Sequence, residues 1–183
     1  MKGVLRNIMV VLLASLPEGL SAQTPQPMLE QVAPTFTLND LNGRSWSLEQ
    51  MRGKITVIHF ATTWCPFCNA EAPNLEQLYK DYRDKGVQVL IVDVMEDKEL
   101  AEKSFRRFNF SFPVLLDADG KVSTSYAPEN VQPDLARHEV PIASNLIVDK
   151  DGIIRFYSLL NTASFDAKLS QLKEKLNELQ QSQ

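Results

Sequence analysis

The sequence predicts an α/β domain in which helices flank a central mixed sheet. Three patterns predict this class: β-branched runs alternate with helical patterns in the middle of the chain, a strand pair then forms a hairpin, and an amphipathic helix closes the sequence. Strands that alternate with helices require crossover connections and a parallel sheet, whereas a hairpin adds antiparallel strands. With 183 residues the chain has the length of one domain.

The N-terminal residues have the pattern of an export signal. Lys2 and Arg6 precede a short apolar run over residues 8–16, and Ala22 is a small residue at a suitable cleavage point. The run is shorter than the about 20 residues that a membrane-spanning helix needs. We therefore expect export to the periplasm, or a membrane tether facing the periplasm if the signal stays uncleaved. The expected divisions are a signal peptide over residues 1–22, a linker over residues 23–32 and one domain over residues 33–183.

The first elements of the domain are a hairpin and a buried strand. Alternating residues at 35–38 and 45–48 flank turn-forming residues at 39–43, which predicts an N-terminal hairpin. The run Ile55–Phe60 is almost continuously apolar and β-branched, as in a strand that is covered on both faces. A long helix is expected to follow, over about residues 66–85.

The rest of the domain continues the alternation and ends in a hairpin and a helix. We expect a helix over residues 98–108, a long polar loop without periodicity over 127–139, and a terminal helix over 164–179 with Ser164 as its N-cap. The remaining strands are expected at residues 87–92, 113–116, 145–148 and 153–157, the last two joined by a turn at 149–152.

The charge pattern argues against a nucleic-acid partner. The formal net charge is −4 at pH 7, and no segment of the chain gathers lysines and arginines as a phosphate-binding surface would. We therefore expect no nucleic-acid partner, and no membrane-spanning segment once the signal has been removed.

The chain has only two cysteines, Cys65 and Cys68, and they are three residues apart. A structural zinc site of cysteines usually needs a second pair, which this chain lacks. A disulfide across so short a loop adds little stability, because the gain grows with the length of the closed loop. The spacing therefore indicates a chemical function for the pair rather than a structural one.

The position of the pair suggests how it reacts. Cys65 follows the buried strand and opens the long helix, where unpaired backbone N–H groups and the helix macrodipole favour a thiolate. An easily ionised thiol would make Cys65 the attacking nucleophile. Cys68, one helical turn further on, could resolve a mixed disulfide formed on Cys65. This interpretation requires that solvent reaches Cys65.

The residues around the pair resemble a known family. The segment WCPFCNAEAP, residues 64–73, is similar to the active site of the thioredoxin superfamily, and specifically to that of its TlpA/ResA-like branch. Further similar segments lie at residues 86–89, 112–117 and 149–152, so that the resemblance covers about residues 33–180 in order. The resemblance implies a thioredoxin-like fold with an N-terminal hairpin and an extra strand–helix insert.

The resemblance also implies an activity. Members of this branch are exported thiol–disulfide oxidoreductases that typically reduce disulfides, often during cytochrome c maturation. The expected partners are protein thiols and disulfides and an upstream thiol electron donor, and we expect no cofactor and no metal. The loop at residues 127–139 looks longer than the corresponding loop of the family and should border the substrate groove.

Two further site residues follow from the resemblance. Glu71 matches the active-site glutamate of the family, which implies a general base for Cys68; the alternative is a surface glutamate favoured by the helix dipole. The cis-proline of the family resembles the Val140–Pro141 bond, where a cis bond would present the preceding backbone to a substrate chain. The alternative is a trans proline that ends a loop.

Aromatic residues and histidines complete the candidate site. Trp64, Pro66 and Phe67 are expected to form an apolar rim for the substrate, although Trp64 could instead pack on the hairpin. His59 stands where relatives carry an acid or an asparagine, and it could relay a proton or be a neutral, hydrogen-bonded core histidine. His138 could flank the site, but a lone loop histidine is more often an ordinary surface residue.

Other functions could use the same residues. A disulfide oxidase or isomerase would use the cysteine pair in the opposite direction, and the residues between the cysteines do not decide the direction. A peroxidase is less favoured, because Ile58 stands where peroxiredoxins carry the proline of their motif. A copper-binding chaperone module would need His138 as a third ligand, and related copper chaperones have a wider cysteine spacing.

Overall fold

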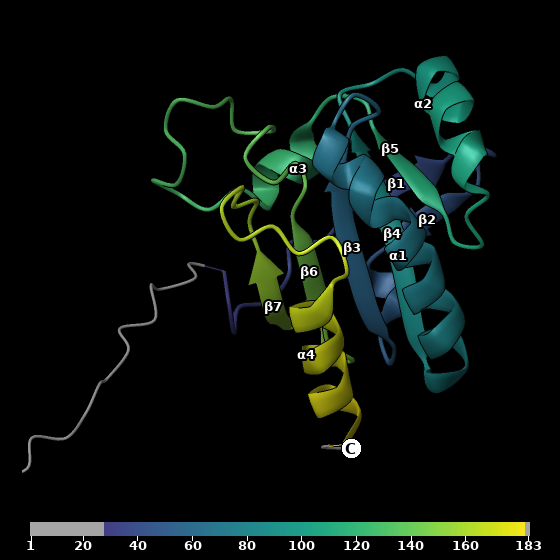
Figure 1. Cartoon of the computed structure of the whole chain (residues 1–183), viewed down its shortest axis with the longest axis vertical. Helices are drawn as coiled ribbons and strands as arrows, with labels where there is room; N and C mark the ends of the chain where they lie inside the picture. Colours follow the sequence, from purple (N-terminus) through teal and green to yellow (C-terminus); the bar gives the residue numbers. More distant parts are fainter. Residues whose placement is uncertain (1–27, 182–183) are drawn as a thin grey trace, which may run out of the picture.

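The computed structural model describes residues 28–181, and Figure 1 shows their arrangement. The predicted signal peptide and the first half of the predicted linker lie outside the described residues. The strands are β1 (Thr37–Asp40), β2 (Ser45–Ser47), β3 (Ile55–Ala61), β4 (Val87–Val94), β5 (Val114–Asp117), β6 (Asn145–Val148) and β7 (Ile154–Ser158). The helices are α1 (Pro66–Tyr82), α2 (Lys98–Phe105), α3 (Lys121–Ser125) and α4 (Ser170–Gln181), with short 3-10 helices η1 (Glu49–Met51), η2 (Arg83–Lys85) and η3 (Arg106–Phe108). None of these helices has both the length and the apolar composition that crossing a bilayer requires.

The strands form one mixed sheet in the order β2-β1-β5-β4-β3-β6-β7. β3, β4 and β5 are parallel neighbours. The hairpin of β1 and β2 lies at one edge and the hairpin of β6 and β7 at the other, each antiparallel to its neighbours. The predicted α/β class, with an N-terminal hairpin and with α2 and β5 as the extra elements, is confirmed.

The sheet is covered on both faces, which explains why β3 is apolar throughout. Alternate residues of a strand point to opposite faces. Val57 and Ala61 belong to a buried cluster with residues of α1, α2 and α4. Ile58 and Phe60 belong to a second cluster on the other face, built largely from the N-terminal segment and Tyr126.

The parallel pairing of β3 and β4 positions the functional site. Their register aligns Ala61, at the end of β3, with Asp93 near the end of β4. Because the carboxyl ends of parallel strands lie at one edge of a sheet, the segments that follow β3 and β4 meet there. The two cysteines lie in the segment after β3.

The folded domain begins earlier than residue 33, where the sequence placed its start. The N–H of Glu30 donates to the carbonyl of Ile154 at 2.9 Å, and the N–H of Ala33 donates to that of Gly152 at 2.9 Å. Val32 forms a single antiparallel bridge with Ile153. The end of the predicted linker is therefore paired with residues 152–154, which lead into β7.

The terminal helix begins later than predicted. α4 starts at Ser170, and the carboxylate of Asp166 accepts hydrogen bonds from the N–H groups of Ser170 and Gln171. Leu169, just before the helix, has a φ of 58°. Ser164, the predicted N-cap, lies in a preceding turn closed by its own N–H and the carbonyl of Asn161 at 3.2 Å. The carboxylate of Asp166 therefore takes the role that we had assigned to the Ser164 hydroxyl.

Candidate active site

Cys65 and Cys68 form a disulfide at the N-terminus of α1. Cys65 is the N-cap of the helix, and its sulfur accepts a hydrogen bond from the N–H of Cys68 at 3.1 Å. Pro66 occupies the first helical position, where its missing N–H removes no hydrogen bond. The structure therefore places the Cys65 sulfur against the free N–H groups of the helix.

The oxidised pair is almost completely covered. Only 3% of Cys65 and 4% of Cys68 is exposed, whereas the neighbouring Trp64 is 66% exposed. The sequence interpretation required an accessible Cys65, and in the oxidised state the structure leaves it far less exposed than that interpretation expected. Thiol–disulfide exchange requires that an attacking sulfur reach the Cys65 sulfur from one side only.

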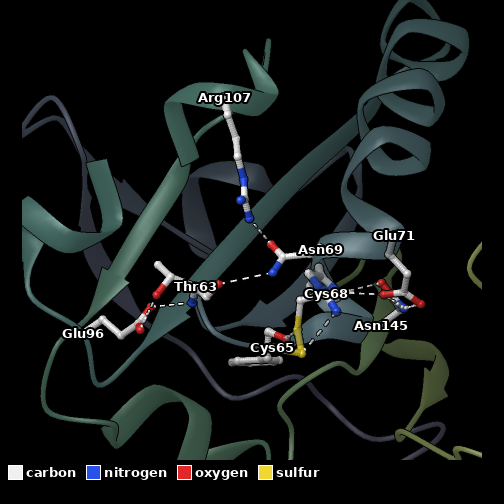
Figure 2. Close-up of a disulfide and its surroundings, with 10 residues drawn as sticks. Thr63, Cys65, Cys68, Asn69, Glu71, Glu96, Arg107 and Asn145 are labelled. Carbon is white, nitrogen blue, oxygen red and sulfur yellow. Dashed lines mark hydrogen bonds and ion pairs between the residues drawn. A yellow bond between two sulfur atoms is a disulfide. The ribbon is translucent and has the colours of Figure 1, made fainter. Parts of the chain in front are cut away.

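Glu71 and Asn145 lie on one side of the disulfide (Figure 2), and His59 joins them in a buried cluster. The side-chain NH₂ of Asn145 donates to both carboxyl oxygens of Glu71 at 3.1 Å. Nδ1 of His59 lies 3.0 Å from the Asn145 side-chain oxygen and 3.3 Å from Glu71 Oε2. The register of β3 and β6 aligns His59 with Asn145, and α1 brings Glu71 over them from one turn beyond Cys68.

Burial shifts the two titratable groups of this cluster in opposite directions. It raises the pKa of Glu71 to about 7, with a smaller contribution from the charge of Asp166, against the hydrogen bond from Asn145. It lowers the pKa of His59 to about 4. Near neutral pH, Glu71 can therefore exchange a proton while His59 stays neutral, which supports the core-histidine interpretation of His59 over the proton relay.

A cavity of about 720 Å³ adjoins the Glu71 cluster. Glu71, Ala143 and Asn145 lie at its wall, together with Pro128 and Val131 of the long loop. The loop at residues 127–139 thus borders a cavity beside the site; that this loop borders the substrate groove stays a prediction. This cavity gives the Glu71 carboxyl a route for exchanging protons with solvent.

A second network lies on the other side of the disulfide (Figure 2). The carboxylate of Glu96 accepts hydrogen bonds from the N–H of Thr63 at 2.6 Å and from its hydroxyl at 2.7 Å. The side-chain NH₂ of Asn69 donates to the Thr63 carbonyl at 3.2 Å, and Arg107 donates to the Asn69 side-chain oxygen at 2.8 Å. These bonds hold the turn that leads from β3 into Cys65.

Asp93 adds a second buried acid beside Glu96. It is 0% exposed, and burial, followed by the neighbouring Glu96 carboxyl, raises its pKa to about 9. Sequence reasoning missed Asp93, Glu96 and Asn145. Asp93 and Glu96 could have been found from their place at the end of the strand next to β3, whereas Asn145 depends on strand register.

The predicted cis bond before Pro141 is wrong, because none of the peptide bonds in residues 28–181 is cis. Pro141 lies within tight turns: the N–H of Ile142 donates to the carbonyl of Glu139 at 3.0 Å, and that of Ser144 to the Pro141 carbonyl at 2.8 Å. The next residues reach β3: the N–H of Ala143, which has a φ of 61°, donates to the Phe60 carbonyl at 2.8 Å, and the Phe60 N–H donates to the Ser144 carbonyl at 3.2 Å. Ala143 belongs to the buried cluster that contains both cysteines. The predicted role of Val140 and Pro141 in binding a substrate chain stays a prediction.

The remaining predicted residues divide between the rim and its surroundings. Trp64 is exposed beside the disulfide, as a substrate contact would be. Phe67 packs edge-on against Phe165 at 4.9 Å between ring centres, so it also contacts the segment before α4. His138 lies near Gly120 and the side chain of Met95, on the α3 side of the site.

The fold and the site together define the class. An α/β fold with a helix-capping cysteine pair at the end of a central strand is that of a thioredoxin-like oxidoreductase. Among solved structures, a disulfide isomerase homologue from Bacteroides thetaiotaomicron superposes with a TM-score of 0.70 at 21% identity, covering 84% of this chain and 90% of its own. A secreted disulfide oxidoreductase of Mycobacterium tuberculosis, homologous to E. coli DsbE, has a TM-score of 0.62 at 26% identity over 79% and 96% of the two chains.

Sequence comparison gives the family. A model described as the AhpC/TSA family matches residues 29–157. The thiol–disulfide oxidoreductase ResA of Bacillus cereus is 30% identical over 136 residues, which are 74% of this chain and 72% of that protein. The chain belongs to the AhpC/TSA family of the thioredoxin superfamily and is a TlpA/ResA-like thiol–disulfide oxidoreductase.

Proposed function

We propose that the protein is an exported reductase of protein disulfides. Its direction is supported by the carboxyl groups of Glu71, beside β6, and Glu96, after β4, which are buried on either side of the cysteine pair. Negative charge near a sulfur disfavours its thiolate, which raises the free energy of the reduced pair relative to the disulfide. A reduced pair that is destabilised in this way donates electrons more readily.

The reaction follows from the order of the groups along α1. The Cys65 thiolate attacks one sulfur of a substrate disulfide, forms a mixed disulfide and releases the other substrate sulfur as a thiolate. Cys68 gives its proton to Glu71 and attacks the Cys65 sulfur, which releases the second substrate thiolate and closes the Cys65–Cys68 disulfide. Two electrons pass to the substrate, and an upstream dithiol donor returns them by the reverse exchange.

Glu71 is the observation that carries this proposal. A general base is effective when its pKa lies near the working pH, and burial brings the Glu71 carboxyl to about 7. The side-chain NH₂ of Asn145 donates hydrogen bonds to both Glu71 oxygens. The adjoining cavity, which Glu71 lines, gives the Glu71 carboxyl access to water. The proposed substrate contacts are Trp64, Pro66 and Phe67.

Export and substrate class are part of the same proposal. The signal-like pattern over residues 1–22 supports export, as does the likeness to a secreted mycobacterial oxidoreductase. The resemblance to the TlpA/ResA-like branch supports substrates of the cytochrome c maturation type. The copper-binding alternative has no such support, because in residues 28–181 no three His, Cys, Asp or Glu side chains are grouped as metal ligands.

A redox titration of the Cys65–Cys68 couple tests the direction. We expect a potential closer to that of thioredoxin, about −270 mV, than to that of DsbA, about −120 mV. A value near that of DsbA would show that the protein is an oxidase. Cys68→Ser should accumulate mixed disulfides through Cys65, whereas Cys65→Ser should accumulate none, because only Cys65 attacks the substrate.

A further inference from the structure

Glu96 holds the turn that precedes Cys65. It lies after β4 and is 8% exposed, and both of its carboxyl oxygens accept hydrogen bonds from Thr63, two residues before the nucleophile. The N–H of Cys65 in turn donates to the carbonyl of Thr62 at 3.3 Å. The Glu96 carboxylate therefore fixes the backbone at Thr63, and this backbone orients the Cys65 sulfur.

The charge of Glu96 is not offset by a cation. Among residues 28–181, no ion pair involves Glu96. The nearest cationic group of the network, Arg107, donates to Asn69 instead. Asp93 holds its proton at neutral pH, since burial and the neighbouring Glu96 raise its pKa to about 9. Both Glu96 oxygens accept hydrogen bonds, from the N–H and the hydroxyl of Thr63, which is the geometry of an ionised carboxylate.

We propose that Glu96 is a positioning residue of the redox site and that its carboxylate makes the Cys65–Cys68 couple more reducing. A fixed negative charge beside the helix N-terminus opposes the stabilisation that the helix gives to the Cys65 thiolate. The disulfide is neutral and does not feel this opposition. The inference deepens the proposed reductase function and rests on it, because it names a group that sets the direction.

Glu76 provides a matched control within the same chain. It is also 8% exposed, and its two oxygens accept hydrogen bonds from the N–H and the hydroxyl of Ser111 at 2.8 and 2.7 Å. It lies two helical turns beyond Cys68, and Lys80 offsets its charge at 3.0 Å. The two glutamates make the same contact, so a comparison isolates the effect of charge near the cysteines.

The experiment compares Glu96→Gln and Glu76→Gln in the full chain, equilibrated with glutathione redox buffers. For Glu96→Gln we expect the equilibrium to shift about three- to tenfold towards the reduced pair, which is about 15–30 mV for a two-electron couple. Glu76→Gln should stay within twofold of the wild type. Glu96→Asp keeps the charge but shortens the side chain, and it should also stay within twofold.

The sign of the shift separates the charge from a purely structural role. A loosened Thr63 turn would weaken the support of the thiolate and shift the equilibrium towards the disulfide. No shift in Glu96→Gln, a shift towards the disulfide, or an equal shift in Glu76→Gln would each overturn the inference. If Glu96→Gln does not fold, Thr63→Val/Glu96→Met removes the carboxylate together with the hydroxyl that it accepts from, leaves only the Thr63 backbone N–H without its acceptor, and must give the same shift towards the reduced pair. An oxidising wild-type couple would instead sink the reductase proposal, whatever the variants show.

Discussion

Glu71 and His59 share one buried cluster, and burial moves their pKa values apart. The pKa of Glu71 rises from 4.5 to about 7, so the stability that its neutral form contributes is complete below pH 4.5 and is lost as the pH rises through 7. The pKa of His59 falls from 6.5 to about 4. Its contribution is complete above pH 6.5 and is lost as the pH falls through 4. The two effects offset each other over the pH range that they share.

Glu71→Gln should uncover the His59 effect. Relative to the wild type, the free energy of unfolding of the variant should rise by about 3 kcal/mol between pH 4 and pH 7.5, because one pKa unit corresponds to about 1.4 kcal/mol. Urea denaturation of the oxidised protein across this range measures the difference. Glu76→Gln, whose parent carboxyl has a lowered pKa, should show no such rise, and a parallel profile for Glu71→Gln would contradict the assignment.

Trp64 offers a test of substrate contact that does not perturb the fold. Because it is 66% exposed, Trp64→Ala should change the free energy of unfolding by less than about 0.5 kcal/mol. It should lower kcat/KM for a disulfide-bonded protein about tenfold, since burying an aromatic side chain against a partner contributes roughly 1–3 kcal/mol. Reduction of a small disulfide should hardly change. Leu100→Ala, an exposed apolar residue of α2, is the control, and equal losses in both variants would rule out a specific contact.

Site residues that lie near each other in the sequence could be predicted, whereas those brought together by strand pairing could not. Cys65 and Cys68 follow from their spacing along one helix, because a helix fixes which residues share a turn, and Glu71 follows from the family resemblance of the segment that contains them. Asn145 reaches Glu71 only through the register of β3 and β6. Glu96 reaches Thr63 only because β3 and β4 end together. Contacts between separate strands depend on tertiary structure, which short-range patterns do not encode.

At the scale of elements, the central strands and the starts of α1 and α2 were predicted closely, whereas the start of α4 was not. The apolar runs of β3 and β4 are set by burial on both faces, so their residues identify them. The start of α4 depends instead on which of several capping groups takes the free N–H groups. Ser164 and Asp166 are both suitable N-caps by residue type, and the turn at Leu169 favours Asp166.

Replacing each candidate cap distinguishes the two assignments. Asp166→Ala should lower the free energy of unfolding by about 1 kcal/mol, as the loss of an N-cap usually does, and Ser164→Ala should lower it by less than about 0.5 kcal/mol. Chemical denaturation of both variants under the same conditions measures the difference. A larger loss for Ser164→Ala would restore the longer helix that the sequence predicted.

At the scale of the whole molecule, one end of the sheet gathers buried acids that cost stability. Glu71, Asp93 and Glu96 all lie at the carboxyl ends of the parallel strands or against the start of α1, and each is at most 8% exposed. A core built only for stability would place apolar side chains there, because burying a carboxyl group costs free energy. The domain therefore gives up stability at the end of the sheet where its cysteines react.

Asp93 should show this cost most clearly. Burial raises its pKa from 3.8 to about 9, so the stability that its protonated form contributes is complete below pH 3.8 and is lost as the pH rises through 9. Asp93→Asn keeps the shape without the charge and should therefore be more stable than the wild type at pH 8 by several kcal/mol, while the two differ little at pH 4. Urea denaturation of the oxidised proteins at both pH values makes the comparison.

Because a domain of this size is stable by only about 5–15 kcal/mol, such a gain would be a large part of the total. Equal stability of the two proteins at pH 8 would mean that Asp93 is ionised without cost, and that the acids at this end of the sheet are not a burden on the fold.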